Sequence, residues 1–189
     1  MIILFGLAGS GKSTQGGILA EKYQMSWLSV GQVLREDGRF DAILKAGELV
    51  NDDQVIELMS EKIKGEQAKG KDVILDGFPR DEYQAKWFGE NLAKETEMAV
   101  LIEVPKDELI KRMEERGRAD DTREAIERRF LVVEKNIEGI LGILREKGVE
   151  IKKVNGVGTV EEVTKRLEEA FGFLREGRRE VEVPGFLKD

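Results

Sequence analysis

The sequence contains no cysteine and no histidine. Disulfide bonds and thiolate metal sites are therefore excluded, as are imidazole ligands and acid–base catalysis by histidine. The apolar runs are far shorter than the ~18 residues that span a bilayer. The first five residues are apolar, but they have no cationic flank and no cleavage site, so we predict neither a signal peptide nor a membrane anchor. We expect a cytoplasmic protein.

Basic residues are in deficit, with 31 Lys and Arg against 38 Asp and Glu and a formal net charge of −7. This balance argues against a nucleic-acid scaffold. Charged residues still make up 37% of the chain. That share resembles heat-adapted proteins, and the charged surface of a soluble helical protein explains it equally well. The length of 189 residues predicts one domain, with or without a small insertion.

The most informative segment lies at the start of the chain. Residues 6–13 read Gly-Leu-Ala-Gly-Ser-Gly-Lys-Ser, which matches the phosphate-loop pattern G-x-x-x-x-G-K-[ST]. An apolar run long enough for a buried strand precedes it, and a helical pattern follows over 14–23. The glycines let backbone N–H groups point inward, while the helix N-terminus and Lys12 add positive charge. We therefore predict that this loop binds a polyphosphate.

The rest of the chain alternates between strand and helix patterns. This alternation predicts an α/β fold of the phosphate-loop NTPase type, with three layers (α/β/α) and a central parallel sheet of about five strands. The N-terminal strand should lie centrally, and Asp52 or Asp53 should cap the helix that starts there. Strands are predicted over 1–5, 26–30 (or a turn), 72–75, 99–104 and 149–154, and helices over 14–23, 41–47, 52–65, 82–96, 107–116, 122–147 and 160–174.

Arginines recur at predicted loop and helix-end positions. A planar guanidinium group binds phosphate oxygens in pairs. Any one of these arginines is more typical of a solvated surface, but their occurrence beside the turn Asp76-Gly77-Phe78-Pro79-Arg80 favours a second phosphate site. The arginines are Arg35, Arg80, Arg112, Arg116, Arg118, Arg128 and Arg129.

On these residues the chain resembles the adenylate kinases, within the nucleoside monophosphate kinases, from residue 1 to about 172. Residues 75–80, with Gln84 four positions on, carry the most specific match. Segments 29–35, 47–55, 112–129 and 155–158 are similar to the monophosphate-binding, closing, lid and donor-base segments of that family. The resemblance implies one kinase domain over 1–174, with a monophosphate-binding segment at about 29–60 and a vestigial lid at about 116–122.

The resemblance implies reversible, Mg²⁺-dependent, in-line phosphoryl transfer from ATP, and from other triphosphates, to AMP, giving two ADP. Arg112 would stack on the donor base, and Gln84 would read the adenine edge of the acceptor. Asp120 and Asp121 would either pair with arginines or the ribose, or cap a helix. The implied catalytic residues are Lys12, Arg80, Arg116, Arg118 and Arg129. The implied ATP-binding residues are Gly9, Ser10, Gly11, Lys12, Ser13, Thr14, Arg112, Arg116, Gly156 and Val157, and the implied AMP-binding residues are Val30, Gly31, Arg35, Leu49, Val50, Gly77, Arg80 and Gln84. Ser13 and, through water, Asp76 are the implied Mg²⁺ ligands.

Several positions depart from the family pattern. Ala8 replaces a common Pro, and Ser13 replaces the usual Gly and restores the hydroxyl of the general phosphate-loop motif. Val30 and Gln32 replace a Thr and an Asp, so uridylate, cytidylate or broad monophosphate kinase activity stays open beside adenylate kinase activity. Only Gly117 separates Arg116 from Arg118, where relatives insert a lid. A zinc-binding lid is excluded for want of Cys and His, and we expect weak discrimination between donor bases.

Residues 175–189 fall outside the resemblance. They predict either a disordered tail or a short edge strand that docks on its own body or on another copy, which would make the protein a homo-oligomer. A non-catalytic nucleotide-binding module would need no second phosphate site, and a kinase for a non-nucleotide metabolite would need no Gln84. The expected partners are small-molecule nucleotides, with no nucleic acid and no membrane.

Overall fold

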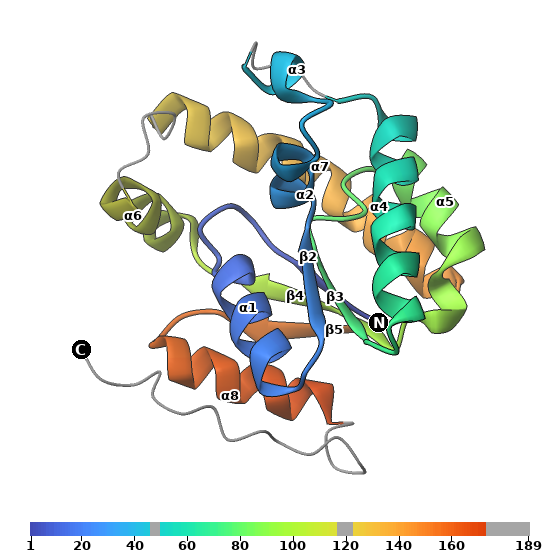
Figure 1. The fold of residues 1–189 in the computed structure, drawn as a ribbon. Helices are drawn as coiled ribbons and strands as arrows, with labels where there is room; N and C mark the ends of the chain where they lie inside the picture. The colour runs from blue at the N-terminus through green and yellow to red at the C-terminus, as the bar shows by residue number, and fades with distance from the viewer. Residues whose placement is uncertain (46–49, 117–122, 173–189) are drawn as a thin grey trace.

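The computed structural model describes residues 1–45, 50–116 and 123–172 (Figure 1). The predicted tail at 175–189 and most of the predicted lid therefore lie outside the described residues. Within the described part, no helix combines the length and the apolar character needed to cross a membrane.

Five parallel strands form the centre of the molecule, in the order β2-β3-β1-β4-β5. The N-terminal strand β1 lies in the middle, as predicted, and all four of its residues are buried. The five-stranded parallel sheet confirms the predicted α/β fold. The strands are β1 (Ile2–Phe5), β2 (Ser26–Ser29), β3 (Val73–Asp76), β4 (Met98–Glu103) and β5 (Glu150–Asn155).

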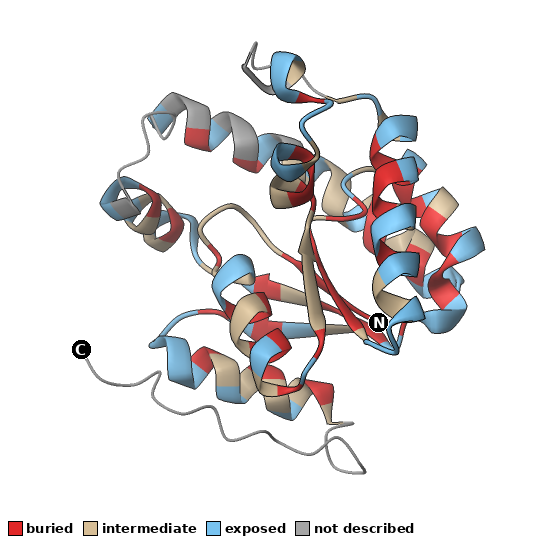
Figure 2. Cartoon of the chain, in the orientation of Figure 1, coloured by how far each residue is buried: buried red, intermediate tan, exposed pale blue. Residues whose placement is uncertain are grey.

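Helices cover both faces of this sheet, because alternate residues of β1 point to opposite sides. Ile2 and Leu4 pack with residues of α1 and α8 on one face, and Ile3 and Phe5 pack with α2, α4, α5 and α7 on the other. Figure 2 shows the buried strands between these two layers. The helices are α1 (Lys12–Lys22), α2 (Val30–Asp37), α3 (Asp41–Lys45), α4 (Asp52–Ala68), α5 (Glu82–Asn91), α6 (Lys106–Arg116), α7 (Arg123–Glu146) and α8 (Val160–Phe171).

A third apolar cluster lies beside the phosphate loop. Leu109 and Met113 on α6 pack with Ile126 and Phe130 on α7, and Leu7 and Ala8 of the loop pack against them. This cluster joins the loop after β1 to the two helices that flank the predicted lid. Helices α6 and α7, which a short segment connects, therefore pack directly against the phosphate loop.

Two details of the predicted elements are wrong. Asn51 caps α4: its side-chain oxygen accepts from the Asp53 N–H at 2.9 Å, so Asp52 and Asp53 occupy the first helical turn. The single helix predicted over 82–96 ends at Asn91 and is followed by a 3₁₀ turn, η1 (Ala93–Glu95). Thr96 then adopts an extended conformation that leads into β4. The N-terminal ammonium group donates to the Glu95 carbonyl at 2.7 Å, which fixes this turn against the start of β1.

Candidate active site

The phosphate loop connects the carboxyl end of β1 to α1. Gly6, Gly9 and Gly11 all have positive φ (147°, 83° and 92°). A Cβ on Gly6 would lie 2.7 Å from the Ile102 carbonyl oxygen, so the backbone here needs glycine for space as well as conformation. Gly11 caps α1 without a side-chain hydrogen bond, and the first turn holds no acidic residue. The free N–H groups and the helix dipole therefore favour an anion at this end of α1.

Lys12 lies within this loop. Its ammonium group donates to the carbonyl oxygens of Gly6 (2.8 Å) and Leu7 (2.9 Å). Burial lowers the pKa of Lys12, the charge of Asp76 raises it, and that of Arg80 lowers it again. The ammonium group is thus held at the loop, where an arriving phosphate can exchange with the carbonyl contacts.

Asp76 ends β3 beside the loop. In the sheet register it faces Leu4 of β1 and Ser29 of β2, which places it at the carboxyl edge where α/β folds bind ligands. The Ser13 hydroxyl donates to its Oδ2 at 2.6 Å, and Asp76 is buried. Among the described residues, no group of three or more Asp or Glu side chains is placed so that it could hold a metal ion by itself. One hydroxyl and one carboxylate nevertheless fit Mg²⁺, which usually keeps several waters and takes its other ligands from substrate phosphates.

Two guanidinium groups lie close together near the turn after β3. The Arg80 Nε donates to the Gly77 carbonyl at 2.8 Å. A Cβ on Gly31 of α2 would lie 3.3 Å from one Arg35 nitrogen and 3.9 Å from one of Arg80, so both groups border Gly31. Loss of solvation lowers the pKa of Arg80, with Asp76 opposing and Arg35 adding to the decrease. Because the two cations repel each other, this position favours an anion between them.

Gln84 lies in the first turn of α5, which Asp81 caps by accepting from the Gln84 N–H at 2.8 Å. The Gln84 side chain is 2% exposed. Its Oε1 accepts from the Arg80 N–H (2.9 Å), and its Nε2 donates to Asp52 Oδ1 (2.7 Å). The amide is therefore anchored to the arginine turn on one side and to α4 on the other.

The side chains of other predicted acceptor residues point into the core. Val30 is fully buried within the apolar cluster on its face of the sheet, and Val50 packs partly buried against the same cluster. The side chains of these two residues therefore contribute to the core, as the structure describes them. Leu49 lies outside the described residues.

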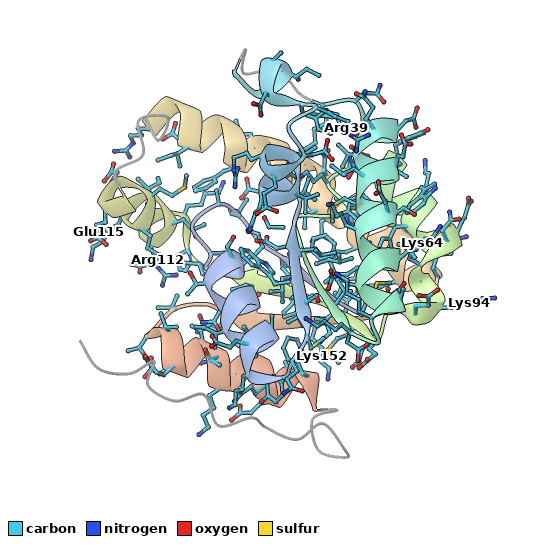
Figure 3. The ribbon with its side chains drawn as sticks, in the orientation of Figure 1. Arg39, Lys64, Lys94, Arg112, Glu115 and Lys152 are labelled. Carbon is cyan, nitrogen blue, oxygen red and sulfur yellow. The ribbon has the colours of Figure 1, made fainter. Side chains whose placement is uncertain are left out.

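At the predicted donor-base position, Arg112 links α6 to the loop after β5. Its Nε donates to Glu108 (2.8 Å), and both terminal nitrogens donate to the Gly156 carbonyl (3.2 Å each). In Figure 3 Arg112 lies below α6, on the side toward α8. Val157 is 38% exposed beside this contact. A base could thus meet a guanidinium plane and a small apolar side chain here.

The remaining predicted residues divide into two groups. Ser10 is buried in the loop, Gly9 contacts α6, and Thr14 is exposed on the first turn of α1. The structure does not describe the positions of the side chains of Arg116, Arg118, Arg128, Arg129, Asp120 and Asp121.

The structure also reveals side chains that the motifs did not indicate. Asp52 was expected as a helix cap within the closing segment, and the structure shows that it also holds Gln84. Gln15, which is 2% exposed, donates to the Val160 carbonyl (3.0 Å) and accepts from the Thr164 hydroxyl (2.7 Å), so it ties α1 to the start of α8. The only signal of these contacts in the sequence was the presence of polar residues at buried positions of two helices. Such a residue needs a hydrogen-bond partner, but the sequence does not say which residue that partner is.

Comparisons with known proteins agree on one family. The family model described as adenylate kinase matches residues 4–149. An adenylate kinase of Thermus thermophilus is 36% identical over 187 residues, covering 90% of this chain and 96% of the relative. One of Prochlorococcus marinus is 32% identical over 184 residues (92% and 97%). One of Brucella anthropi is 36% identical over 188 residues (88% and 96%).

Proposed function

The chain belongs to the adenylate kinase family, and from that premise we propose that it transfers a phosphoryl group reversibly from ATP to AMP, giving two ADP. The observation that carries this proposal is a pair of cationic positions that both interact with Asp76. One is Lys12 of the phosphate loop, and the other is Arg80, which borders Gly31 together with Arg35. A protein that only bound a triphosphate would need the first position alone.

Each position has a distinct role in the proposed reaction. The loop amides and Lys12 hold the β- and γ-phosphates of the donor, and Arg35 and Arg80 hold the phosphate of the acceptor. Such transfer needs alignment of two anions and neutralisation of charge more than it needs a general base. The two sites meet at the carboxyl edge of β1 and β3, which suits in-line attack. We assign further stabilisation of the transferring group to Arg116, Arg118 and Arg129.

We propose that Ser13 binds Mg²⁺ directly and that Asp76 binds it through water. Their hydrogen bond already brings both oxygens to one place. The metal, when bound, supplies positive charge to the donor phosphates. The protein contributes by holding the Asp76 carboxylate at the end of β3 and the Ser13 hydroxyl at the start of α1.

Base selectivity should differ between the two sites. Gln84 offers both a donor and an acceptor to the acceptor base, which favours AMP. The donor base has only Arg112 and the loop at 156–157, so we propose that triphosphates other than ATP also serve as donors. Uridylate or cytidylate kinase activity is the competing proposal, because Val30 and Gln32 depart from the family pattern.

A matrix of donor and acceptor nucleotides in a coupled assay for diphosphate production tests these statements. We expect AMP to give the highest kcat/KM among acceptors, and ATP to exceed GTP by less than about 100-fold, or 2.7 kcal/mol. Arg35→Ala should raise the KM for AMP. Arg39→Ala is the matched control, since Arg39 follows the same helix but pairs with Asp37. Absence of transfer to every monophosphate would contradict the proposal.

Two further proposals concern the whole chain. We propose that residues 175–189, which lie outside the described residues, make contacts between copies of the chain, and a monomeric mass by light scattering would contradict this. We also propose heat adaptation, supported by the charged fraction of 37%. A melting temperature within the mesophilic range of about 45–65 °C would contradict that proposal.

A further inference from the structure

The carboxamide of Gln84 is fixed by partners of opposite kind. The backbone N–H of Arg80 can only donate, and it faces Oε1 at 2.9 Å. The carboxylate of Asp52, when ionised, can only accept, and it faces Nε2 at 2.7 Å. Turning the amide over would place NH₂ against N–H and oxygen against carboxylate. The two contacts therefore define which end of the amide is the donor.

The carboxyl group of Asp81 lies beside that of Asp52. Loss of solvation raises the pKa of Asp81, the Gln84 N–H opposes this, and the charge and hydrogen bond of Asp52 raise it again. Gln84 is also 2% exposed, so packing restricts rotation of its amide.

A fixed amide distinguishes two classes of acceptor base. After its two internal contacts, the amide retains one N–H and one oxygen lone pair. Adenine and cytosine present a ring-nitrogen acceptor beside an amino donor, whereas guanine and uracil present a ring N–H beside a carbonyl oxygen. In the proposed function Arg35 and Arg80 hold the acceptor phosphate, so the base reaches the fixed amide from one direction.

We propose that Asp52 is a positioning residue for acceptor specificity: by holding Nε2 of Gln84, it makes the site favour amino-bearing bases over keto bases. This inference rests on the proposed function. It assigns selectivity to a residue on α4 that contacts the base only through Gln84.

The variant Asp52→Asn tests this proposal, because asparagine can present either NH₂ or oxygen and so permits both amide orientations. Asp53→Asn is the matched control. It removes the same charge from the same helical turn, but Asp53 accepts from the Tyr83 hydroxyl (2.7 Å) and does not touch Gln84. CMP and UMP are the informative acceptors, since they share one ring size and differ in the amino and keto pattern. The kcat/KM of each, the kcat/KM for AMP and the KM for ATP are measured for all three proteins.

We expect the native chain to prefer CMP to UMP, and Asp52→Asn to reduce this ratio by about tenfold or more, as the loss of one paired base contact predicts. The change should fall on the KM of the acceptor, with the KM for ATP and the melting temperature close to those of Asp53→Asn. If transfer to AMP persists but Asp52→Asn and Asp53→Asn show the same ratio of kcat/KM for CMP to that for UMP, the inference is overturned. Loss of transfer to AMP in the native chain would instead overturn the proposed function. Calorimetric titration with CMP and UMP gives the same ratio if turnover of either is too slow.

Discussion

Gly16 lies on α1 under the indole of Trp27 on β2. A Cβ at this position would lie 2.7 Å from both Cδ1 and Nε1 of Trp27, and 3.5 Å from a methyl group of Leu4. The next residue, Gly17, is on the same helix, and a Cβ there would meet nothing within 4 Å. The pair Gly16→Ala and Gly17→Ala therefore separates the cost of a steric clash from the effect of alanine on the helix.

The two variants should move stability in different directions. Alanine in a helix interior is favoured over glycine by about 1 kcal/mol, so Gly17→Ala should stabilise the protein by about that amount. Gly16→Ala gains the same helix preference but overpacks the space under Trp27, which costs about 1–3 kcal/mol. We expect the free energy of unfolding of Gly16→Ala to be about 1–3 kcal/mol lower than that of Gly17→Ala. Each kcal/mol should lower the melting temperature by roughly 2–4 °C.

Urea unfolding followed by circular dichroism measures this difference, and the coupled kinase assay measures its consequence. Because α1 begins at Lys12, a displacement of the helix that relieves the clash also moves the ammonium group at the phosphate loop. Gly16→Ala should therefore lose more kcat/KM than Gly17→Ala. Trp27→Phe in the Gly16→Ala background should recover part of the stability, since within the described residues the Trp27 Nε1 has no hydrogen-bond partner to lose. Equal stability of the two alanine variants would refute the reasoning.

The remaining predictions concern the site and its carboxylates. Lys12→Ala should lower kcat by about 100-fold or more through loss of charge stabilisation, with an unchanged unfolding midpoint, and a loss below tenfold would argue against the assigned role. Ser13→Ala should weaken Mg²⁺ binding to the nucleotide complex by about tenfold, which titration calorimetry or electron paramagnetic resonance of bound Mn²⁺ can measure. An unchanged affinity would mean that Asp76 and the phosphates bind the metal without Ser13. Asp81→Asn keeps the helix cap but removes a carboxyl group whose pKa is raised by burial and by Asp52. A raised pKa in the folded state means that stability falls as the pH rises through it, so this variant should be more stable than the native chain at neutral pH and equal to it near pH 3 by urea unfolding.

Local patterns in the sequence predicted most of the elements with only small errors at their ends, but they did not predict the helix α2. The phosphate loop was evident because its glycines and Lys12 are consecutive. The helix predicted over 82–96 was wrong beyond Asn91, since its residues suit a helix but the turn into β4 ends it at Leu92. Asn51 was overlooked as the cap of α4 because two aspartates follow it and have similar capping preference.

The contacts that define the site could not be predicted in the same way. Ser13 and Asp76 are 63 positions apart, and Asp52 and Gln84 are 32 apart. The family signature indicated that Asp76, Arg80 and Gln84 belong to one site, but it gave no sign that Asp52 would hold the Gln84 amide. That contact depends on how α4 and α5 pack on one face of the sheet.

The sequence by itself determined the alternation of strands and helices, the position of the phosphate loop and the residue types available for two phosphates. These properties follow from neighbours in the chain, because backbone conformation and periodic burial are set over a few residues. Only the tertiary structure decided which polar group meets which. The sheet register brings Asp76 to Ser13, and the packing of α4 beside α5 brings Asp52 to Gln84. A hydrogen bond requires its atoms within about 3 Å, and that precision arises only when distant segments pack together.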